Sequence, residues 1–465
     1  MSHTSLKITV AGIRGKIGES LVPAVALDFA EIFGTLNNGG KIILGTDTRL
    51  STTLIKSAVI SGLVATGCEI IDIGVVSTPT TQLMVRHLKA AGGIMITASH
   101  NPIMWNGLKF ISGKGIFWDE NEMHRLFDFY HKWQNVKKKA ETVEDLVRNV
   151  HIKYKDIQNL GKVETFPEAV NLHIDEVLKQ VDVKLIKKAK LKVVADCCNG
   201  AGAVMNPYLF KKLGVEASYI FDTPDGRFER EPEPLPENLT ALRKAVIKNK
   251  ADIGFAQDAD ADRLAIVNED GNPIGEDYTL VLVLKYLLSR HPNPKGKVVA
   301  TNLSTTRAFD DVANEYKAKI IHTKIGEVNV SKALMDNDSI LGGEGNGGVI
   351  IPSIGYGRDS FAGMAFVLEY MAKRNLKISE LVKEIPVYKF VKKKKEVSSA
   401  QDIAKILTKT RQLYRNEIID DTDGIKVILK DSWLHVRGSN TEPIVRYFAE
   451  AKTLAKAKEL IDNVF

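Results

Sequence analysis

The sequence predicts an α/β protein that contains three similar units. Each unit begins with an apolar run of strand character that enters a polar turn, at 41–45, 192–196 and 297–301. A helical stretch and a second strand follow in each unit, at 53–66 and 69–73, 204–213 and 217–220, and 305–317 and 319–321. Strands that alternate with helices are typical of βαβ units with largely parallel sheets. Because ligands gather at the carboxyl ends of such strands, we expect the three units to share one cleft.

Each unit then closes with a further apolar run and a polar loop, and the first of these loops carries a serine. The loop reads Thr-Ala-Ser-His-Asn-Pro at 97–102, and the run before it is bounded by glycines. A free serine hydroxyl is a weak nucleophile and needs a neighbouring base or metal. His100 is adjacent, and Lys109 follows a second turn signal. Ser99 is therefore a candidate nucleophile, although a plain turn also explains this segment taken alone.

The second loop carries three aspartates at alternate positions, Asp258, Asp260 and Asp262. Three such carboxylates repel one another unless a cation or basic groups gather them. On an extended segment alternate side chains project to one side, so their oxygens can converge on one hard cation. A calcium-binding hand is one alternative, but Arg263 stands where that loop requires glycine. The pattern favours magnesium, and a solvated acidic turn is the other alternative.

The third loop, Gly-Gly-Glu-Gly-Asn-Gly-Gly at 342–348, is rich in glycine and carries Glu344 and Asn346. It lacks the lysine of a nucleotide-binding P-loop. Backbone groups together with one carboxylate and one carboxamide suit the hydroxyl groups of a sugar.

A fourth segment near the C-terminus combines arginines with small hydroxylated residues. Arginine provides planar donor forks, and a glycine leaves backbone N–H groups free to orient, so the combination suits a phosphate dianion. A plain loop-to-strand transition is the alternative for this segment alone. Its candidate binding residues are Arg437, Ser439, Asn440, Thr441 and Arg446.

These four segments, in this order and over the whole chain, resemble the α-D-phosphohexomutase superfamily. The resemblance implies three α/β domains and a distinct C-terminal α+β domain around a central cleft. It also implies the domain ranges 1–150 for the phosphoserine, 151–271 for the metal, 272–385 for sugar recognition and 386–465 for phosphate binding. We expect the chain to be a monomer or a homodimer.

The resemblance further implies the chemistry of a phosphohexose mutase, which interconverts hexose 6-phosphate and hexose 1-phosphate through a bisphosphorylated sugar. Ser99 would be phosphorylated, primed by a hexose bisphosphate, and would join the three aspartates in binding Mg²⁺. His100 and Lys109 are candidates for proton transfer, and Arg14 and Arg263 would steady the charge of the phosphoryl group. Glu344 and Asn346 would contact the sugar, and the segment from Arg437 to Arg446 would hold the phosphate that does not react.

The preferred hexose is less clearly specified by the sequence. Asn346 and Gly348 replace the serine and histidine that many bacterial relatives carry, and the loop resembles that of archaeal-type phosphoglucosamine mutases. Glucosamine phosphate is therefore favoured, with mannose or glucose phosphate as the alternative. A metal-dependent sugar phosphatase and a non-catalytic sugar-phosphate-binding protein are the alternatives from other classes.

Composition excludes several other classes of function. The chain has 465 residues, enough for several domains, and its 44% apolar and 26% charged residues are ordinary for a globular protein. The three cysteines do not indicate a disulfide framework, and no run approaches the ~20 apolar residues of a membrane span, so we expect a cytoplasmic protein. The net charge is +7, but the lysine runs at 137–139 and 392–395 lack interleaved aromatics. We therefore expect solvated lysines and no nucleic-acid partner.

Overall fold

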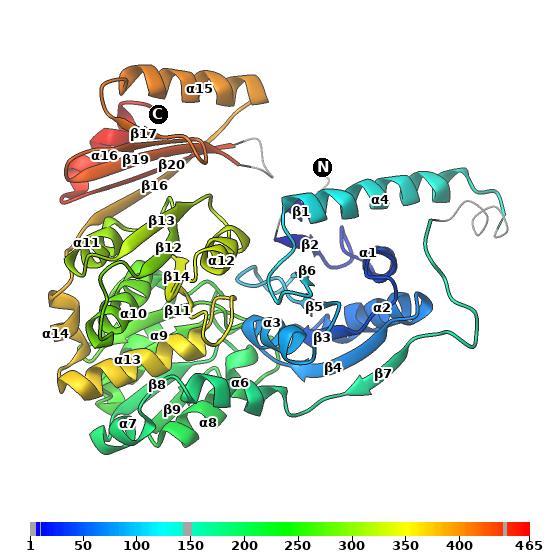
Figure 1. Ribbon diagram of the computed structural model, residues 1–465, viewed down its shortest axis with the longest axis horizontal. Coiled ribbons are helices and arrows are strands. Elements are labelled where there is room, and N and C mark those ends of the chain that lie inside the picture. Colours follow the sequence, from blue (N-terminus) through cyan, green and yellow to red (C-terminus); the bar gives the residue numbers. More distant parts are fainter. Residues whose placement is uncertain (1–5, 10, 143–150, 440–443) are drawn as a thin grey trace.

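The computed structural model describes residues 6–9, 11–142, 151–439 and 444–465, and they form four sheets with their covering helices (Figure 1). Three α/β units follow one another in the chain, and a fourth, mainly antiparallel unit completes it. In Figure 1 the first unit lies at the right, the fourth at the upper left, the third below the fourth, and the second at the lower left. The predicted fold class is confirmed. Across the described ranges, no helix is long and apolar enough to cross a membrane.

The first unit contains a seven-stranded mixed sheet. Its elements are β1 (Lys7–Thr9), β2 (Gly12–Lys16), α1 (Pro23–Leu36), β3 (Ile42–Thr46), α2 (Thr52–Ala65), β4 (Glu69–Val75), α3 (Thr78–His87), β5 (Gly92–Ile96), β6 (Trp105–Ser112), α4 (Glu120–Lys139) and β7 (Lys162–Thr165). The strand order is β1-β2-β6-β5-β3-β4-β7, in which β3 pairs in parallel with β4 and β5 while β6 is antiparallel to β5. Because β7 pairs with β4, this sheet extends past the boundary expected at position 150.

The second unit repeats the core of this arrangement with four strands. Its elements are α6 (Ala169–Leu178), α7 (Val183–Ala189), β8 (Lys192–Asp196), α8 (Ala201–Leu213), β9 (Glu216–Ile220), the 3₁₀ helix η1 (Pro236–Asn238), α9 (Thr240–Asn249), β10 (Ile253–Gln257) and β11 (Leu264–Asn268). The strand order is β11-β10-β8-β9, with β11 antiparallel and the others parallel.

The third unit repeats it again. Its elements are α10 (Glu276–Arg290), β12 (Val298–Asn302), α11 (Arg307–Glu315), β13 (Lys319–Thr323), α12 (Glu327–Asp336), β14 (Leu341–Glu344), β15 (Gly348–Ile350), α13 (Ser360–Arg374) and α14 (Ile378–Lys383). The order β15-β14-β12-β13 matches β11-β10-β8-β9 and the β6-β5-β3-β4 part of the first sheet. Hence β5, β10 and β14 occupy equivalent positions, and each of them leads into one of the three loops singled out from the sequence.

The predicted helices differ from the observed ones mainly at their ends. The helix expected at 305–317 is α11, which starts later because the Thr306 side chain caps it by accepting a hydrogen bond from the N–H of Ala308. It also ends earlier, and Lys317 after it has a left-handed φ of 55°. The helix expected at 204–213 begins at Ala201, directly after Gly200.

The fourth unit is a five-stranded antiparallel sheet with α15 and α16. Its elements are β16 (Lys389–Glu396), α15 (Ala400–Leu413), β17 (Ile418–Asp420), β18 (Ile425–Ile428), β19 (Ser432–Gly438), β20 (Ile444–Ala451) and α16 (Leu454–Asp462). The strand order is β16-β20-β19-β18-β17. Two-residue alternation along β19 and β20 places one face on the helices and the other toward the third unit.

Among the described residues, the hydrophobic core forms several apolar clusters, and none of them joins the fourth unit to the other three. One apolar cluster runs through the first three units and includes Ile43, Phe255 and Phe361. The fourth unit has its own cluster, which includes Leu434 and Tyr447. A unit that has its own core can move as a rigid body relative to its neighbours. The reason is that interfaces between such units are more polar than a continuous hydrophobic core.

Candidate active site

A cavity of about 480 Å³ is lined by residues of all four units, which is the central cleft expected from the topology. The structure brings most of the predicted site residues to its wall: Arg14, His100, Lys109, Arg263, Glu344, Asn346, Arg437, Ser439 and Arg446. Ser99 and the three aspartates are buried next to this wall. Asn440 and Thr441 lie outside the described residues.

Ser99 occupies a constrained turn directly after β5. Its φ is 51°, a left-handed conformation that a non-glycine residue rarely adopts. Its N–H donates to Thr97 Oγ1 at 2.8 Å. The Ser99 hydroxyl donates to Asp258 Oδ2 at 3.0 Å and lies 3.4 Å from His100 Nδ1. The predicted nucleophile therefore contacts both the triple-aspartate loop and a base.

Arg49 fixes the shape of this turn, and sequence reasoning missed its role. The buried guanidinium donates to four backbone carbonyls of the turn, those of Ser99 (2.6 Å), Asn101 (2.7 Å), Pro102 (3.0 Å) and Trp105 (2.8 Å). Its Nε donates to Asp47 Oδ2 at 3.1 Å, and Thr97 Oγ1 donates to the same oxygen at 2.6 Å. Buried backbone carbonyls need hydrogen-bond donors. In this turn Arg49 supplies the donors that backbone N–H groups supply in a helix or a sheet. The Asp-Thr-Arg stretch at 47–49 was the available sequence signal.

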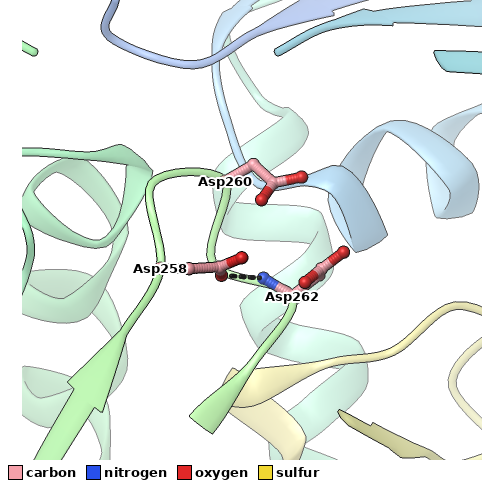
Figure 2. A group of neighbouring side chains, drawn as sticks. All are labelled: Asp258, Asp260 and Asp262. Carbon is pink, nitrogen blue, oxygen red and sulfur yellow. Dashed lines mark hydrogen bonds between the residues drawn. The ribbon is translucent and has the colours of Figure 1, made fainter. Parts of the chain in front are cut away.

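The triple-aspartate loop is a tight turn, so the extended segment expected from the alternation is wrong. Ala261 has a φ of 51°, and its N–H donates to the carbonyl of Asp258 at 3.1 Å. Asp258 Oδ1 accepts the backbone N–H groups of Asp262 and Arg263, each at 3.2 Å. Figure 2 shows the three carboxylates around this turn, which joins β10 to β11. Turn geometry, and not strand alternation, brings the carboxylates together.

The three carboxylates fit a hard divalent cation. Each offers one oxygen, and these oxygens lie within 4.8 Å of one another. Asp260 Oδ1 and Asp262 Oδ1 are buried and have no hydrogen-bond partner among the described residues. An all-oxygen set of buried carboxylates is the donor chemistry that Mg²⁺ prefers.

The other oxygens of this triad are held by basic and hydroxyl groups. Lys109 Nζ donates to Asp260 Oδ2 at 2.6 Å and to Asp262 Oδ2 at 3.2 Å. Thr78, the first residue of α3, donates its hydroxyl to Asp260 Oδ2. These partners turn both carboxylates so that their Oδ1 atoms remain available. Sequence reasoning missed Thr78, because its contact joins the first unit to the second.

Burial and neighbouring charges shift the pKa values of Asp258 and Asp262 in opposite directions. Burial, reinforced by Asp262 and Asp260, raises the pKa of Asp258 well above its usual value. Burial acts in the same direction on Asp262, but Arg358 and Lys109 outweigh it, and the pKa of Asp262 is lowered. Asp262 is thus held as an anion by Arg358 and Lys109. Asp258, in contrast, needs a cation nearby to ionise fully.

His100 and Lys109 differ in protonation. Arg263 and then burial lower the pKa of His100 well below its usual value. Burial would lower the pKa of Lys109, but Asp260 and Asp262 outweigh it and raise that pKa. Near neutral pH, His100 is therefore a neutral imidazole, and Lys109 is a fixed cation.

Arg358 joins the triple-aspartate loop to the glycine-rich loop. Its guanidinium donates to Asp262 Oδ2 (2.7 Å), Glu344 Oε2 (2.9 Å) and Glu327 Oε2 (2.9 Å), and it is almost fully buried. Burial raises the pKa of Glu327 to about 7. The sequence signal was the Gly-Arg-Asp stretch at 357–359, but nothing in the sequence indicated that one arginine donates to three carboxylates.

We expect Arg358→Met to lower the free energy of unfolding by about 3–5 kcal/mol, because it leaves three buried carboxylates without their common cation. Urea unfolding followed by circular dichroism measures the effect. Arg374→Met is the matched control, since the Arg374 side chain is 41% exposed in its pair with Glu384 and should cost less than about 1 kcal/mol. Equal losses in the two variants would contradict the role of Arg358.

The glycine-rich loop carries two side-chain acceptors that differ in their partners. Glu344 Oε1 already accepts hydrogen bonds, whereas Asn346 Oδ1 accepts none from the described residues. Glu344 Oε1 accepts from Asn302 Nδ2 at 2.8 Å and from the N–H of Gly326 at 3.1 Å. Asn346 Oδ1 is buried and has no hydrogen-bond partner within the described ranges. A buried acceptor without a donor is costly, so a hydroxyl or amino group of a ligand would be well placed to satisfy it.

The fourth unit adds a cationic wall to the cleft. Arg437 on β19 lies opposite Arg446 on β20, and Arg437 Nε donates to Asp423 Oδ1 at 3.0 Å. Lys392 on β16 also lines the cleft and pairs with Glu276 at 2.9 Å. The Lys392 side chain is 54% exposed, as expected for a solvated lysine run, although it also faces the cleft. Alternation along β16 separates it from Lys393, which pairs with Asp462 at the surface.

A serine held against a metal-binding triad, with arginines across the cleft, defines an enzyme of phosphoryl transfer with an α/β fold. The chain belongs to the phosphoglucomutase/phosphomannomutase family. Models of that family's α/β/α domains I, II and III match residues 6–137, 171–271 and 275–388, and the model of its C-terminal domain matches residues 388–465.

Individual relatives match over almost the full length. A phosphoglucomutase/phosphomannomutase of Thermococcus kodakarensis is 38% identical, covering 97% of this chain and 96% of the relative. A probable phosphoglucosamine mutase of Methanopyrus kandleri is 35% identical, covering 97% and 95%. The crystal structure of a phosphoglucomutase/phosphomannomutase family protein from Burkholderia thailandensis matches with a TM-score of 0.81 at 26% identity, covering 97% of this chain and 94% of that one. The chain is thus a member of a mutase family.

Proposed function

We propose that the chain interconverts a hexose 6-phosphate and the corresponding hexose 1-phosphate through a phosphorylated Ser99. The observation that carries this proposal is the pairing of the Ser99 hydroxyl with Asp258, at 3.0 Å, beside a cleft whose opposite wall holds Arg437 and Arg446. One side of the cleft suits phosphoryl transfer, and the other suits binding of a phosphate that does not react.

In the proposed first step, the bond between phosphorus and Ser99 Oγ breaks while a bond forms from phosphorus to the free hydroxyl of the sugar. His100 accepts the proton of that hydroxyl and returns it to the departing Ser99 oxygen, which lies 3.4 Å from His100 Nδ1. Lys109, Arg14 and Arg263 supply fixed positive charge around the transferring group. The three aspartates and an oxygen of the phosphoserine would hold Mg²⁺, which would offset the negative charge of the transferring phosphoryl group.

The second step is the reverse transfer from the other end of the sugar. The bisphosphorylated intermediate must turn around so that its other phosphoryl group faces Ser99, while the first one takes the place beside Arg437. A phosphatase would need no second phosphate site, and a binding protein would need neither Ser99 nor the metal triad. Release of inorganic phosphate without formation of the isomer would favour the phosphatase alternative.

Glucosamine phosphate is the proposed substrate, with mannose and glucose phosphates as the alternatives. Support comes from the names of several relatives, among them the one from Methanopyrus kandleri. Asn346 can accept a hydrogen bond from an ammonium group as well as from a hydroxyl, so all three sugars remain chemically compatible. Isomerisation assays with glucosamine, mannose and glucose 6-phosphates, each primed with its bisphosphate, test the choice. A value of kcat/KM for glucosamine phosphate below either of the others would contradict it.

We expect Arg437→Ala to raise KM about tenfold to a hundredfold for both the 1-phosphate and the 6-phosphate. Either phosphate occupies the Arg437 site in turn, so the loss of a charge-assisted contact should affect both directions. Steady-state kinetics from each substrate measures it, and Arg415→Ala, in the turn after α15 and away from the cleft, is the control. A defect in only one direction would argue against the mutase reaction.

A further inference from the structure

Asp423 contacts the phosphate-binding arginine and a different unit at the same time. It lies in the turn between β17 and β18, and its side chain is 15% exposed. Asp423 Oδ1 accepts from Arg437 Nε at 3.0 Å, and Asp423 Oδ2 accepts from the backbone N–H of Ile325 at 3.0 Å. Asp423 does not itself line the cleft among the described residues, so it can act only through the groups that it holds.

The backbone that Asp423 holds belongs to the sugar side of the cleft. Ile325 and Gly326 precede α12 and line the cavity. The N–H of Gly326 donates to Glu344 Oε1 at 3.1 Å. Two successive N–H groups thus connect Asp423, and through it Arg437, to the carboxylate of the glycine-rich loop.

The same contact sets the direction of Arg437. A guanidinium is planar and carries its donors in a rigid fork. When Nε is held by Asp423, the two terminal nitrogens are left as a pair with which to bind a phosphate. Lysine could not be oriented in this way, because its ammonium has no fixed fork.

Polar contacts dominate the rest of this junction. His435 Nδ1 lies 2.9 Å from Ser304 Oγ, and the N–H of Arg307 donates to Glu450 Oε2 at 2.8 Å. The fourth unit has a separate apolar core, so hydrogen bonds and ion pairs of this kind help to hold it against the third unit. The loss of one of them shifts the balance between a closed and an open cleft.

We propose that Asp423 is a positioning residue that links the phosphate site to the sugar-binding loops and keeps the cleft closed while the bisphosphorylated intermediate turns around. This inference rests on the proposed mutase function. With the link broken, Arg437 loses its orientation and the fourth unit opens more often. Both effects weaken the binding of either monophosphate, and opening also lets the intermediate escape into solution.

The test compares Asp423→Asn with Asp421→Asn in the full-length enzyme. Asparagine is nearly isosteric but has one acceptor oxygen where aspartate has two, so it cannot hold both Arg437 and Ile325. Asp421 is in the same turn, is 67% exposed and pairs only at the surface with Arg411 at 2.8 Å. Equal thermal midpoints establish that both variants are folded. KM and kcat are measured from each monophosphate, and the bisphosphate released per turnover is measured by rapid quench from enzyme labelled on the phosphoserine.

For Asp423→Asn we expect KM to rise about tenfold in both directions, with a smaller change in kcat and several-fold more bisphosphate released. Asp421→Asn should match the unmodified enzyme. In an Arg437→Ala background, Asp423→Asn should add little to KM but should still increase release of the bisphosphate. Equal KM and equal release in Asp423→Asn and Asp421→Asn would overturn this inference alone, whereas an unmodified enzyme that forms no isomer would overturn the proposed function.

Discussion

Replacing Ser99 with alanine is expected to abolish isomerisation, with a loss of more than about 10⁴-fold in kcat. The variant has no hydroxyl at position 99 to carry the phosphoryl group. Intact-mass analysis should show a phosphate on the unmodified enzyme, and peptide analysis should place it at Ser99. The fold should be unaffected, since the hydroxyl donates only to Asp258 and lies near His100.

Ser57→Ala is a suitable control for this experiment. Ser57 is on the exposed side of α2, where its hydroxyl donates to the carbonyl of Thr53 at 2.9 Å. This variant should keep both the phosphate and the activity. A stable phosphate found only at another residue, or full activity of Ser99→Ala without added bisphosphate, would show that the nucleophile has been assigned wrongly.

The sequence was sufficient to predict the three-fold repetition of α/β units, because alternation of apolar strands and helical stretches is a local property. It also predicted that the loops after β5, β10 and β14 meet, since equivalent strand ends of similar units face one cleft. The ordered motifs carried the family resemblance. Strand and helix patterns and short motifs depend on residues that are close in sequence, so they can be recognised without knowledge of the fold.

The contacts that cross between units could not be predicted in the same way. Thr78 binds Asp260, and Asp423 binds Ile325, only because separate units are placed against each other. Arg358 likewise serves carboxylates from two different units. No local pattern encodes such distances, so an isolated arginine or threonine in the sequence gives no sign of its partner.

The prediction of an extended triple-aspartate loop was wrong for a different reason. Strand alternation explained the spacing, but β10 and β11 form a hairpin in which Gln257 lies opposite Leu264, so the aspartates occupy its connection. Two apolar runs on either side of a short polar segment were the signal for that hairpin. The positive φ of Ala261 was not predictable, because alanine seldom adopts it and the surrounding contacts impose it.

The second large effect is expected for Asp260→Asn in the triple-aspartate loop. Asp260 Oδ2 accepts from Thr78 and Lys109, and its Oδ1 has no partner among the described residues. An asparagine side chain must turn its NH₂ group either toward those donors or toward the metal site. In both orientations a donor replaces a needed acceptor, so the affinity for Mg²⁺ should fall by at least about tenfold.

Turnover of Asp260→Asn should fall about 10²–10³-fold, because the metal contributes several kcal/mol of charge stabilisation to the transferring phosphoryl group. Calorimetric titration with Mg²⁺ measures binding apart from activity. Asp270→Asn replaces an exposed residue just after β11. It controls for the loss of one negative charge in the same unit and should change neither the affinity for Mg²⁺ nor the turnover.

Because Lys109 keeps Asp262 as a partner at 3.2 Å, the thermal midpoint of Asp260→Asn should stay close to that of the unmodified enzyme. Wild-type affinity for Mg²⁺ in Asp260→Asn would therefore mean that the cation binds elsewhere, whereas weak binding with normal turnover would mean that the reaction does not depend on this triad.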